Sequence, residues 1–412
     1  MPVLTEARAV RVLGRCGLDF GPVSDPRRQS GLGFSLDGLL RLHVAAFACG
    51  KHTLRAIESF ADDLTTKASR ALGLTRPPAD TTLYDLDSRL KPDGFREVLW
   101  QQVRTDLDSK AVINDLFAGG VATFDGKGCG SGMGEAPNDV CRTSVCDAAG
   151  TRCWDVFALR TVLTSSSARP ALDQELIDGK HGEATTFGPM LLRIAGRFPA
   201  LFRYITTDAG LASAHNAEIV LLLNKVYVFA IKGNFKRLFP LAQEMLRDAE
   251  VVASTLERAQ GCLVQRELRR VRVPADEKFP GATQFWGVRQ TRTTDDGAVT
   301  TEDRVFITNA PWDELSPERI LKLVRLHWGI ENNANWTADM VFVEDTQCPC
   351  RAGNGVLVLS WLRLLAYNVV AVFRAHLPHS DGCPAAWERS RELIYQAWLY
   401  LGRCLAHAAT RA

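Results

Sequence analysis

Two aspartates each follow a short apolar run that predicts a β-strand. Asp125 ends the run GGVATFD and is followed by Gly126, and Asp208 ends the run LFRYITTD and is followed by an Ala-Gly pair. Ligand crevices in open α/β sheets form at the carboxyl ends of strands. The two carboxylates are therefore expected to lie together at one edge of a sheet.

A third carboxylate continues the apolar stripe of a late predicted helix. Offsets 0, 3, 4, 7 and 11 of this stripe hold Ile320, Leu323, Val324, His327 and Glu331. These positions share one face of an α-helix, so Glu331 is expected to face the core, where a carboxylate needs a partner or a metal. Three converging carboxylates form an all-oxygen site that suits Mg²⁺, with Mn²⁺ as a substitute. Two such ions about 3.5–4 Å apart can stabilise both reacting oxygens of a phosphoryl transfer.

Each of these residues has a simpler interpretation when it is taken alone. An Asp followed by Gly after a strand is usually only a turn, and a glutamate on a helix usually faces solvent. The prediction of a site therefore depends on the combination of the three carboxylates, in this order, on this pattern of strands and helices.

The elements that must position these residues change in character along the chain. Residues 1–110 have apolar side chains at helical spacing and predict a small helical domain. Residues 111–235 read as three strands, a helix, a strand, a helix and a strand, which indicates an α/β sheet. A polar segment of predicted strands occupies residues 236–310. Residues 311–412 follow, and their first helix has Ser316 as its cap and a proline at its first position.

Composition excludes several classes of protein. The chain has 412 residues, of which 46% are hydrophobic and 23% charged, and its formal net charge is +2. These values exclude a disordered, collagen-like or coiled-coil chain. The near-balanced charge neither requires nor excludes a nucleic-acid partner, because a basic patch can exist within a neutral total.

The cysteines and the most apolar segment bear on the cellular setting. The 11 cysteines are too few and too irregularly spaced for a disulfide scaffold, and the first 20 residues contain no apolar run of signal-peptide length. We therefore expect a reduced, cytoplasmic protein. Residues 355–373 are about as long as a membrane span, but Arg363 and Asn368 interrupt them, which predicts a buried helix and no membrane partner.

Several short blocks together resemble the signature blocks of bacterial insertion-sequence transposases with a DDE catalytic triad. They are FDGKG (124–128), TTDAG (206–210), FAIKGN (229–234) and RLHWGIENNANW (325–336). The continuation, ADMVFVEDTQ (338–347) and residues 354–370, is similar to the H-repeat-associated group. The resemblance covers most of the chain, and its His-Trp-Gly-Ile-Glu-Asn block is the most specific part.

This resemblance implies a ribonuclease-H-like catalytic core with an inserted β-rich segment and a helical N-terminal domain that binds DNA ends. It implies that Asp125, Asp208 and Glu331 are the catalytic triad and hold the metal ions. The implied partner is double-stranded DNA, both the terminal repeats of the mobile element and the target. A homodimer on DNA and a nucleoid-associated location in the bacterial cytoplasm follow from the same resemblance.

The resemblance also suggests DNA contacts. Lys127 and Lys232 are placed near the phosphate backbone. His327 stands where many relatives have an arginine, so its phosphate contact is an open question. Trp286 lies in the inserted segment, where a related aromatic stacks on an extruded base, although a core tryptophan is the more common case. Arg270 belongs to a basic run on a predicted strand, which is equally consistent with phosphate contacts and with a charged edge strand.

Alternatives remain open at this stage. Glu183, in a weak form of a family Lys-x-Asn-Glu block, either assists the metal site or is a solvated helix-start residue. A metal-dependent nuclease of the same fold and an inactive DNA-binding remnant also fit the sequence. A zinc-stabilised regulatory protein would use cysteines whose spacing is unlike that of zinc knuckles, namely Cys141, Cys146, Cys153, Cys348 and Cys350.

Overall fold

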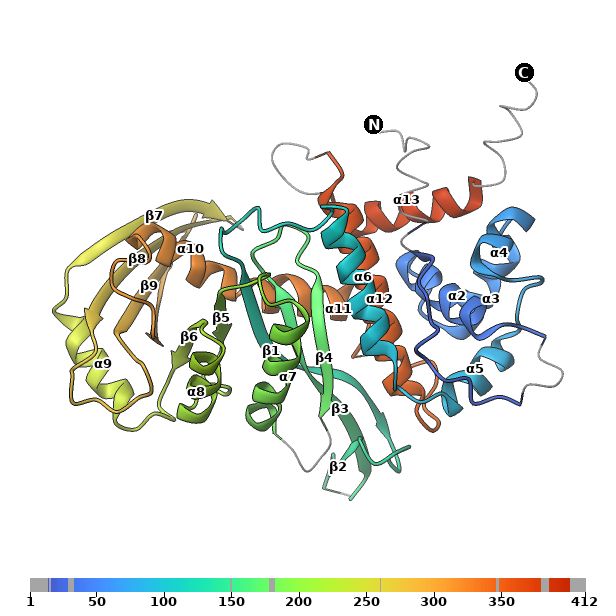
Figure 1. Cartoon of the computed structure of the whole chain (residues 1–412), viewed down its shortest axis with the longest axis horizontal. Coiled ribbons are helices and arrows are strands. Elements are labelled where there is room, and N and C mark those ends of the chain that lie inside the picture. The colour runs from blue at the N-terminus through green and yellow to red at the C-terminus, as the bar shows by residue number, and fades with distance from the viewer. Residues whose placement is uncertain are drawn as a thin grey trace.

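One long mixed sheet with helices on both faces is joined at one end to a bundle of helices (Figure 1). This arrangement is seen in a computed structural model. The structure describes residues 14, 16–28, 33–148, 150–177, 182–259, 261–345, 348–378 and 385–400. The mixed α/β class predicted from the sequence is confirmed.

The first part of the described chain is helical, as predicted. Its helices are α2 (Leu36–Ala48), α3 (Leu54–Asp63), α4 (Thr66–Leu72), α5 (Asp80–Arg89) and α6 (Phe95–Asp108). Three of them begin at a hydroxyl cap that accepts a backbone N–H, namely Ser35, Thr53 and Thr65. They share one hydrophobic core with two late helices, α12 (Gly355–Ala375) and α13 (Trp387–Tyr400). The two ends of the chain therefore stabilise each other.

Helix α12 is long and apolar enough to cross a membrane, yet its most hydrophobic window is completely buried within the protein. The polar residues in it have partners inside the fold. Asn368 donates to the backbone oxygen of Ala171 at 3.0 Å and accepts from its backbone nitrogen at 2.8 Å. The guanidinium of Arg363 lies 5.4 Å from the ring centroid of Phe47. The prediction of a buried helix is confirmed.

Ten strands of the described residues form the sheet. They are β1 (Val121–Met133), β2 (Arg142–Val145), β3 (Arg152–Leu163), β4 (Ala171–Ile177), β5 (Tyr204–Thr207), β6 (Val226–Ile231), β7 (Val251–Ala259), β8 (Cys262–Arg272), β9 (Gln284–Thr294) and β10 (Val299–Thr308). Their spatial order is β2-β3-β1-β5-β6-β10-β9-β8-β7, and β4 also pairs with β3. The neighbours β1, β5 and β6 are parallel, whereas the remaining pairs are antiparallel.

Helices cover both faces of this sheet. Helices α7 (Glu183–Arg197), α8 (Ala214–Leu222) and α9 (Leu238–Arg247) pack on one face. Helix α10 (Pro317–His327) packs on the other, and its cap, Ser316, accepts from the backbone N–H of Arg319 as the sequence predicts. A π-helix, η1 (Ile330–Asn335), and the short helix α11 (Trp336–Met340) follow.

Two parts of the sheet differ from the sequence-based prediction. Strand β4 was not predicted, because its apolar residues are mixed with Asp173, which is completely buried and paired with Arg96 at 2.9 Å. The strands predicted for residues 236–310 are present, but this segment begins with helix α9, and β10 pairs directly with β6. These strands therefore extend the central sheet.

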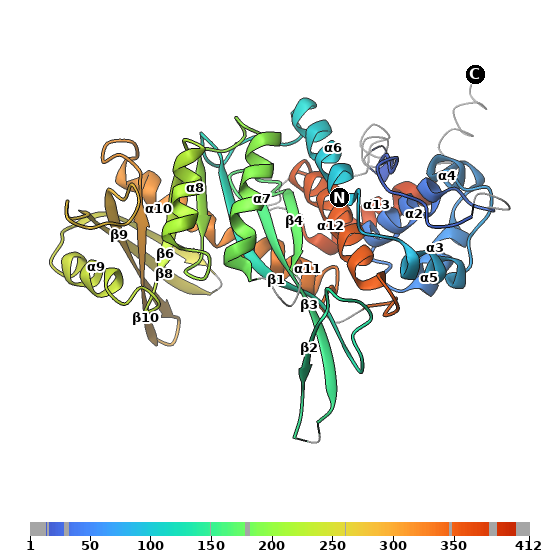
Figure 2. The same ribbon diagram turned by 60° about the horizontal axis from the view of Figure 1, so that its bottom comes forward.

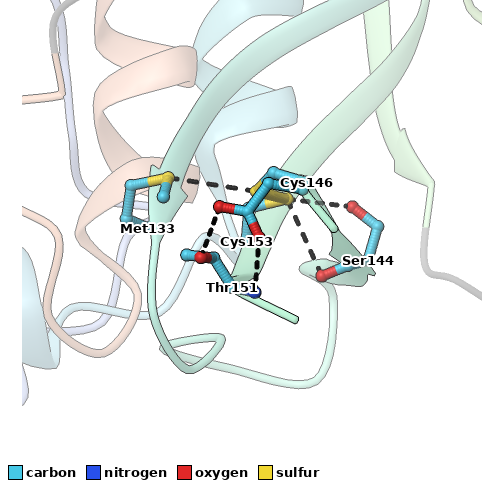
Figure 3. Close-up of a disulfide and its surroundings, with 6 residues drawn as sticks. Met133, Ser144, Cys146, Thr151 and Cys153 are labelled. Atoms are coloured by element: carbon cyan, nitrogen blue, oxygen red, sulfur yellow. Dashed lines mark hydrogen bonds between the residues drawn. A yellow bond between two sulfur atoms is a disulfide. The ribbon is translucent and has the colours of Figure 1, made fainter. Parts of the chain in front are cut away.

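A hairpin formed by β2 and the outer half of β3 projects from the body (Figure 2). A disulfide joins Cys146 and Cys153 across it (Figure 3). The expectation that all cysteines are reduced is wrong at this pair, because the antiparallel register brings the two residues together. Their sulfurs are bonded to each other, which removes them from the zinc alternative, and the described residues contain no cluster of three metal-binding side chains.

A buried ion pair connects the sheet to the segment after α11. Arg160 of β3 donates through Nη1 and Nη2 to the two carboxylate oxygens of Glu344, at 2.8 and 2.6 Å. Both side chains are almost completely inaccessible, at 3% and 1% exposure. The pKa of Glu344 is lowered, because the opposing positive charges outweigh the effect of burial. Such a bidentate contact fixes both the distance and the orientation of the two segments.

We predict that Glu344→Gln destabilises the protein strongly, because it leaves a buried guanidinium without its counter-charge. Loss of one partner of a buried pair costs about 3–5 kcal/mol of unfolding free energy, measured by urea denaturation. The control is Asp303→Asn, which breaks the exposed bidentate pair with Arg289 and should cost no more than about 1 kcal/mol. Equal effects of the two substitutions would contradict this account.

Candidate metal and active site

The parallel register of β1 and β5 places Asp125 beside Asp208. Phe124 is the partner of Thr207, so the two aspartates occupy the next position on neighbouring strands. Just below them, the Thr123 hydroxyl lies 2.8 Å from that of Thr206 and thereby joins the two strands. The predicted convergence of the two carboxylates is thus built into the sheet.

The two aspartates differ in where they lie relative to the ends of their strands. Strand β5 ends at Thr207, and Asp208 follows it as predicted, accepting from the backbone N–H of Gly210 at 3.2 Å. Asp125 was expected to end its strand as well, and this prediction is wrong. Strand β1 continues to Met133, because its ladder with β3 persists after its pairing with β5 has ended.

The position of Glu331 also differs from the prediction. The α-helical stripe holds as far as His327, where α10 ends, and its first four members, of which His327 is the last, are buried. Glu331 then lies in the π-helix η1 and is exposed. The wider π turn shifts the phase of the following residues, so Glu331 leaves the core-facing stripe. Its carboxylate nonetheless lies near enough to Asp125 to act on it electrostatically.

A fourth carboxylate, Glu183, lies at the same place. It is the first residue of α7, and its side chain passes directly over Gly126, where an added Cβ would lie 2.0 Å from Oε1 of Glu183. It also acts on both Asp125 and Asp208. The sequence left two interpretations of Glu183 open, and the structure favours a role at the metal site over a solvated position at the start of a helix. In the sequence, the weak Lys-x-Asn-Glu block was the one feature that pointed to this role.

The site carries an excess of negative charge. Burial, followed by the charges of Glu331, Asp208 and Glu183, raises the pKa of Asp125 to about 7. The Asn335 amide, which donates to Asp125 at 2.7 Å, acts in the opposite direction. Burial and the charge of Asp208 likewise raise the pKa of Glu183.

Such a group of oxygens fits a hard divalent cation in both charge and donor type. As arranged, however, no three metal-binding side chains among the described residues are close enough to hold an ion. Binding therefore requires these side chains to rotate toward one another. Glu331 is exposed and Asp208 is half-buried, so solvent rather than packed side chains surrounds part of each.

Two residues predicted to contact DNA are instead buried near the site. The amine of Lys127 is 4% exposed and forms an ion pair with Asp339, so a phosphate contact would require that pair to break. His327 is 6% exposed, and burial together with Arg304 and Lys232 lowers its pKa to about 4. It is therefore uncharged at neutral pH and is not placed to bind phosphate.

The other predicted DNA contacts have separate outcomes. Trp286 is completely buried in the core between the sheet and α10, so the core alternative is correct and base stacking is not possible there. Arg270 donates to the backbone oxygen of Trp312 at 2.9 Å and lies 4.1 Å from its ring centroid, on an inner strand rather than an edge. Lys232 is exposed, and its phosphate contact stays a prediction.

We predict that Gly126→Ala weakens divalent-metal binding without unfolding the protein. The new methyl group would displace only the tip of the Glu183 side chain, so the backbone of β1 is kept and the carboxylate is moved. Displacing a group that orients a metal site typically weakens affinity about 10–100-fold. Titration of Mn²⁺ measures this, and Gly128→Ala is the control, because an added Cβ there meets nothing within 4 Å. Identical Mn²⁺ affinities for both variants would refute the role given to Glu183.

The raised pKa of Asp125 predicts how stability depends on pH without metal. The folded state holds the Asp125 proton more tightly than the unfolded chain, so ionisation of this group destabilises the fold as the pH rises from about 4 to 7. Asp125→Asn should therefore become progressively more stable than the wild type over this range, measured by urea unfolding in EDTA. Asp303→Asn should show no such gain, because Arg289 lowers the pKa of Asp303 and the stabilisation that this variant loses is already complete above a pH of about 5. A pH-independent difference for Asp125→Asn would contradict the electrostatic account.

Comparison with known proteins places this arrangement in a family. Residues 156–369 match the model described as "Transposase DDE domain", which covers Asp208 and Glu331, whereas Asp125 precedes the matched region. Residues 19–102 match the model described as "DDE_Tnp_1-associated".

Two curated proteins of Escherichia coli K12 are similar to the chain. They are "H repeat-associated putative transposase YhhI" and "Putative protein YbfL". Each is 27% identical over 227 residues, which cover 48% of this chain and 55% of the relative. The chain thus spans about half the length of the curated relatives it matches. The family model extends over half of the chain, and the protein belongs to the transposase DDE domain family.

Proposed function

We propose that the protein cleaves DNA at the ends of a mobile element and joins those ends to a target, with Asp125, Asp208 and Glu331 as its catalytic triad. The observation that carries this proposal is that Asp208, which follows β5, and Glu331 of η1 lie near enough to Asp125 of β1 for their charges to add to the effect of burial, so that the pKa of Asp125 is raised to about 7. Family membership supports a transposase role for the chain.

The strand order supports the proposal of a ribonuclease-H-like core. Strands β4, β3 and β1 are successive antiparallel neighbours, and β5 and β6 continue in parallel from β1. Asp125 lies on β1, and Asp208 directly follows β5, the parallel strand beside it. The extension through β10 to β7 is then an insertion before the helix that leads to Glu331.

The carboxylates of this site would hold Mg²⁺, or Mn²⁺ in its place. Asp125 lies between the other acidic groups, Asp208 borders it on β5, and Glu331 approaches from η1. Glu183 adds a fourth carboxylate over Gly126. When bound, the ions would stabilise negative charge on the attacking and leaving oxygens of a phosphodiester.

DNA is the proposed partner. The helical region α2–α6 would bind the terminal repeats, and exposed Lys232, whose charge acts on His327 near the α10–η1 junction, would contact the phosphate backbone. A lysine at this place adds affinity and register rather than sequence specificity. Two protomers are expected on the DNA, because two element ends must be paired, and the protein would be associated with the nucleoid.

Nicking of a supercoiled plasmid that carries the element ends tests this proposal. We expect purified protein to nick at the ends with Mg²⁺ or Mn²⁺ but not with EDTA. Asp208→Ala should reduce the rate by more than about a thousandfold, because it removes a direct contact to the metal. Asp303→Asn, which changes an exposed carboxylate of β10, should leave the rate unchanged.

The products of the same reaction separate the alternatives. Joining of labelled ends to a second plasmid supports a transposase, whereas cutting without joining supports a nuclease of the same fold. Tight end binding with no cutting would identify an inactive remnant. Nicking that persists in Asp208→Ala or in EDTA would refute the metal-dependent triad.

A further inference from the structure

We propose that Asn335 is a positioning residue that fixes the carboxylate of Asp125 for metal binding, and that the π-helix η1 exists to place it there. This inference rests on the proposed function, since it assigns a role within the same site. It assigns a role in the site to a residue outside the acidic triad and to the irregular π-helix that carries this residue.

The contact itself is direct. Nδ2 of Asn335 donates to Oδ2 of Asp125 at 2.7 Å, a distance typical of a hydrogen bond to a charged acceptor. Asn335 is 9% exposed, so little water competes for this bond. With one oxygen held, the rotation of the Asp125 carboxylate is restricted.

The π-helix sets the spacing of the two residues that reach Asp125. Glu331 and Asn335 are the second and last residues of η1. One is a like charge that repels Asp125, and the other is a donor that holds it. Because π turns are rare and concentrate at functional sites, this irregularity at this position points to a role in the site.

Two ion pairs hold this segment against the strands that carry the site. Lys127, two residues after Asp125 on β1, pairs with Asp339 of α11. Arg160, the ladder partner of Asp125 on β3, pairs with Glu344. The position of Asn335 is thus determined from both sides of Asp125.

The amide of Asn335 is not arranged for stability alone. Its Oδ1 is buried and has no hydrogen-bond partner among the residues that the structure describes. Reversing the amide would place Oδ1 against the carboxylate oxygen of Asp125, so the donor orientation is determined. A buried acceptor without a partner is destabilising. The unpartnered Oδ1 is explained if the Asn335 amide is kept for the hydrogen bond that its Nδ2 donates to Asp125.

Mn²⁺ binding to the full-length protein, followed by electron paramagnetic resonance, tests the proposal. We expect Asn335→Ala to raise the dissociation constant about 10–100-fold, the usual effect of losing a group that orients a metal ligand. Asn335→Leu, which keeps the approximate size but removes the donor, should do the same. Asn333→Ala is the matched control, since Asn333 lies in the same π-helix and makes no side-chain hydrogen bond among the described contacts. It should bind Mn²⁺ as the wild type does.

Nicking assays give a second readout that a purely structural role would not produce. The Asn335 variants should need about 10–100-fold more Mn²⁺ for half-maximal nicking, and saturating Mn²⁺ should restore the maximal rate. Thermal denaturation without metal should show that both variants still unfold cooperatively from a folded state. Wild-type Mn²⁺ affinity in both Asn335 variants, or an equal loss in Asn333→Ala, would overturn the proposal. Failure of the wild type to nick would refute the proposed function while leaving the Mn²⁺ comparison valid.

Discussion

The repulsion among carboxylates at the edge of β1 and β5 is the constraint on which the rest of the site depends. Asp125, Asp208, Glu183 and Glu331 come from four different elements and meet with few compensating cations. Like charges in a partly buried place oppose folding. The surrounding structure must therefore hold these elements together against the repulsion. A divalent cation bound among the carboxylates would relieve that repulsion.

Two ion pairs formed by neighbouring residues of the same strands oppose this repulsion. Arg160 with Glu344 and Lys127 with Asp339 fasten the segment after α10 to β3 and β1. Helix α12, buried along its whole length, closes this region and joins it to the N-terminal helices. The departures from regular structure, a π-helix and an amide with an unpartnered oxygen, occur where this support meets the acidic site.

Much of the fold could be predicted from patterns that are local in the chain. The early helices, the alternation of strands and helices, and the buried character of α12 follow from periodicity and caps. Strand β4 could not be predicted, because its buried acidic residue, Asp173, is compensated by Arg96 and Arg193 of two helices. The attachment of the inserted strands to β6 through β10 likewise depends on a long-range ladder that no local pattern records.

The sequence by itself determined which residues are proposed to carry the chemistry: Asp208 follows its strand as predicted, and Asp125 and Glu331 stand in recognisable blocks. Only the tertiary structure decided how they are presented. Asp125 lies within a strand because β3 continues to pair with it, and Glu331 is exposed because a π turn changes the helical phase. The place of Asn335 was decided by contacts between segments about 200 residues apart, a separation over which side-chain periodicity carries no information.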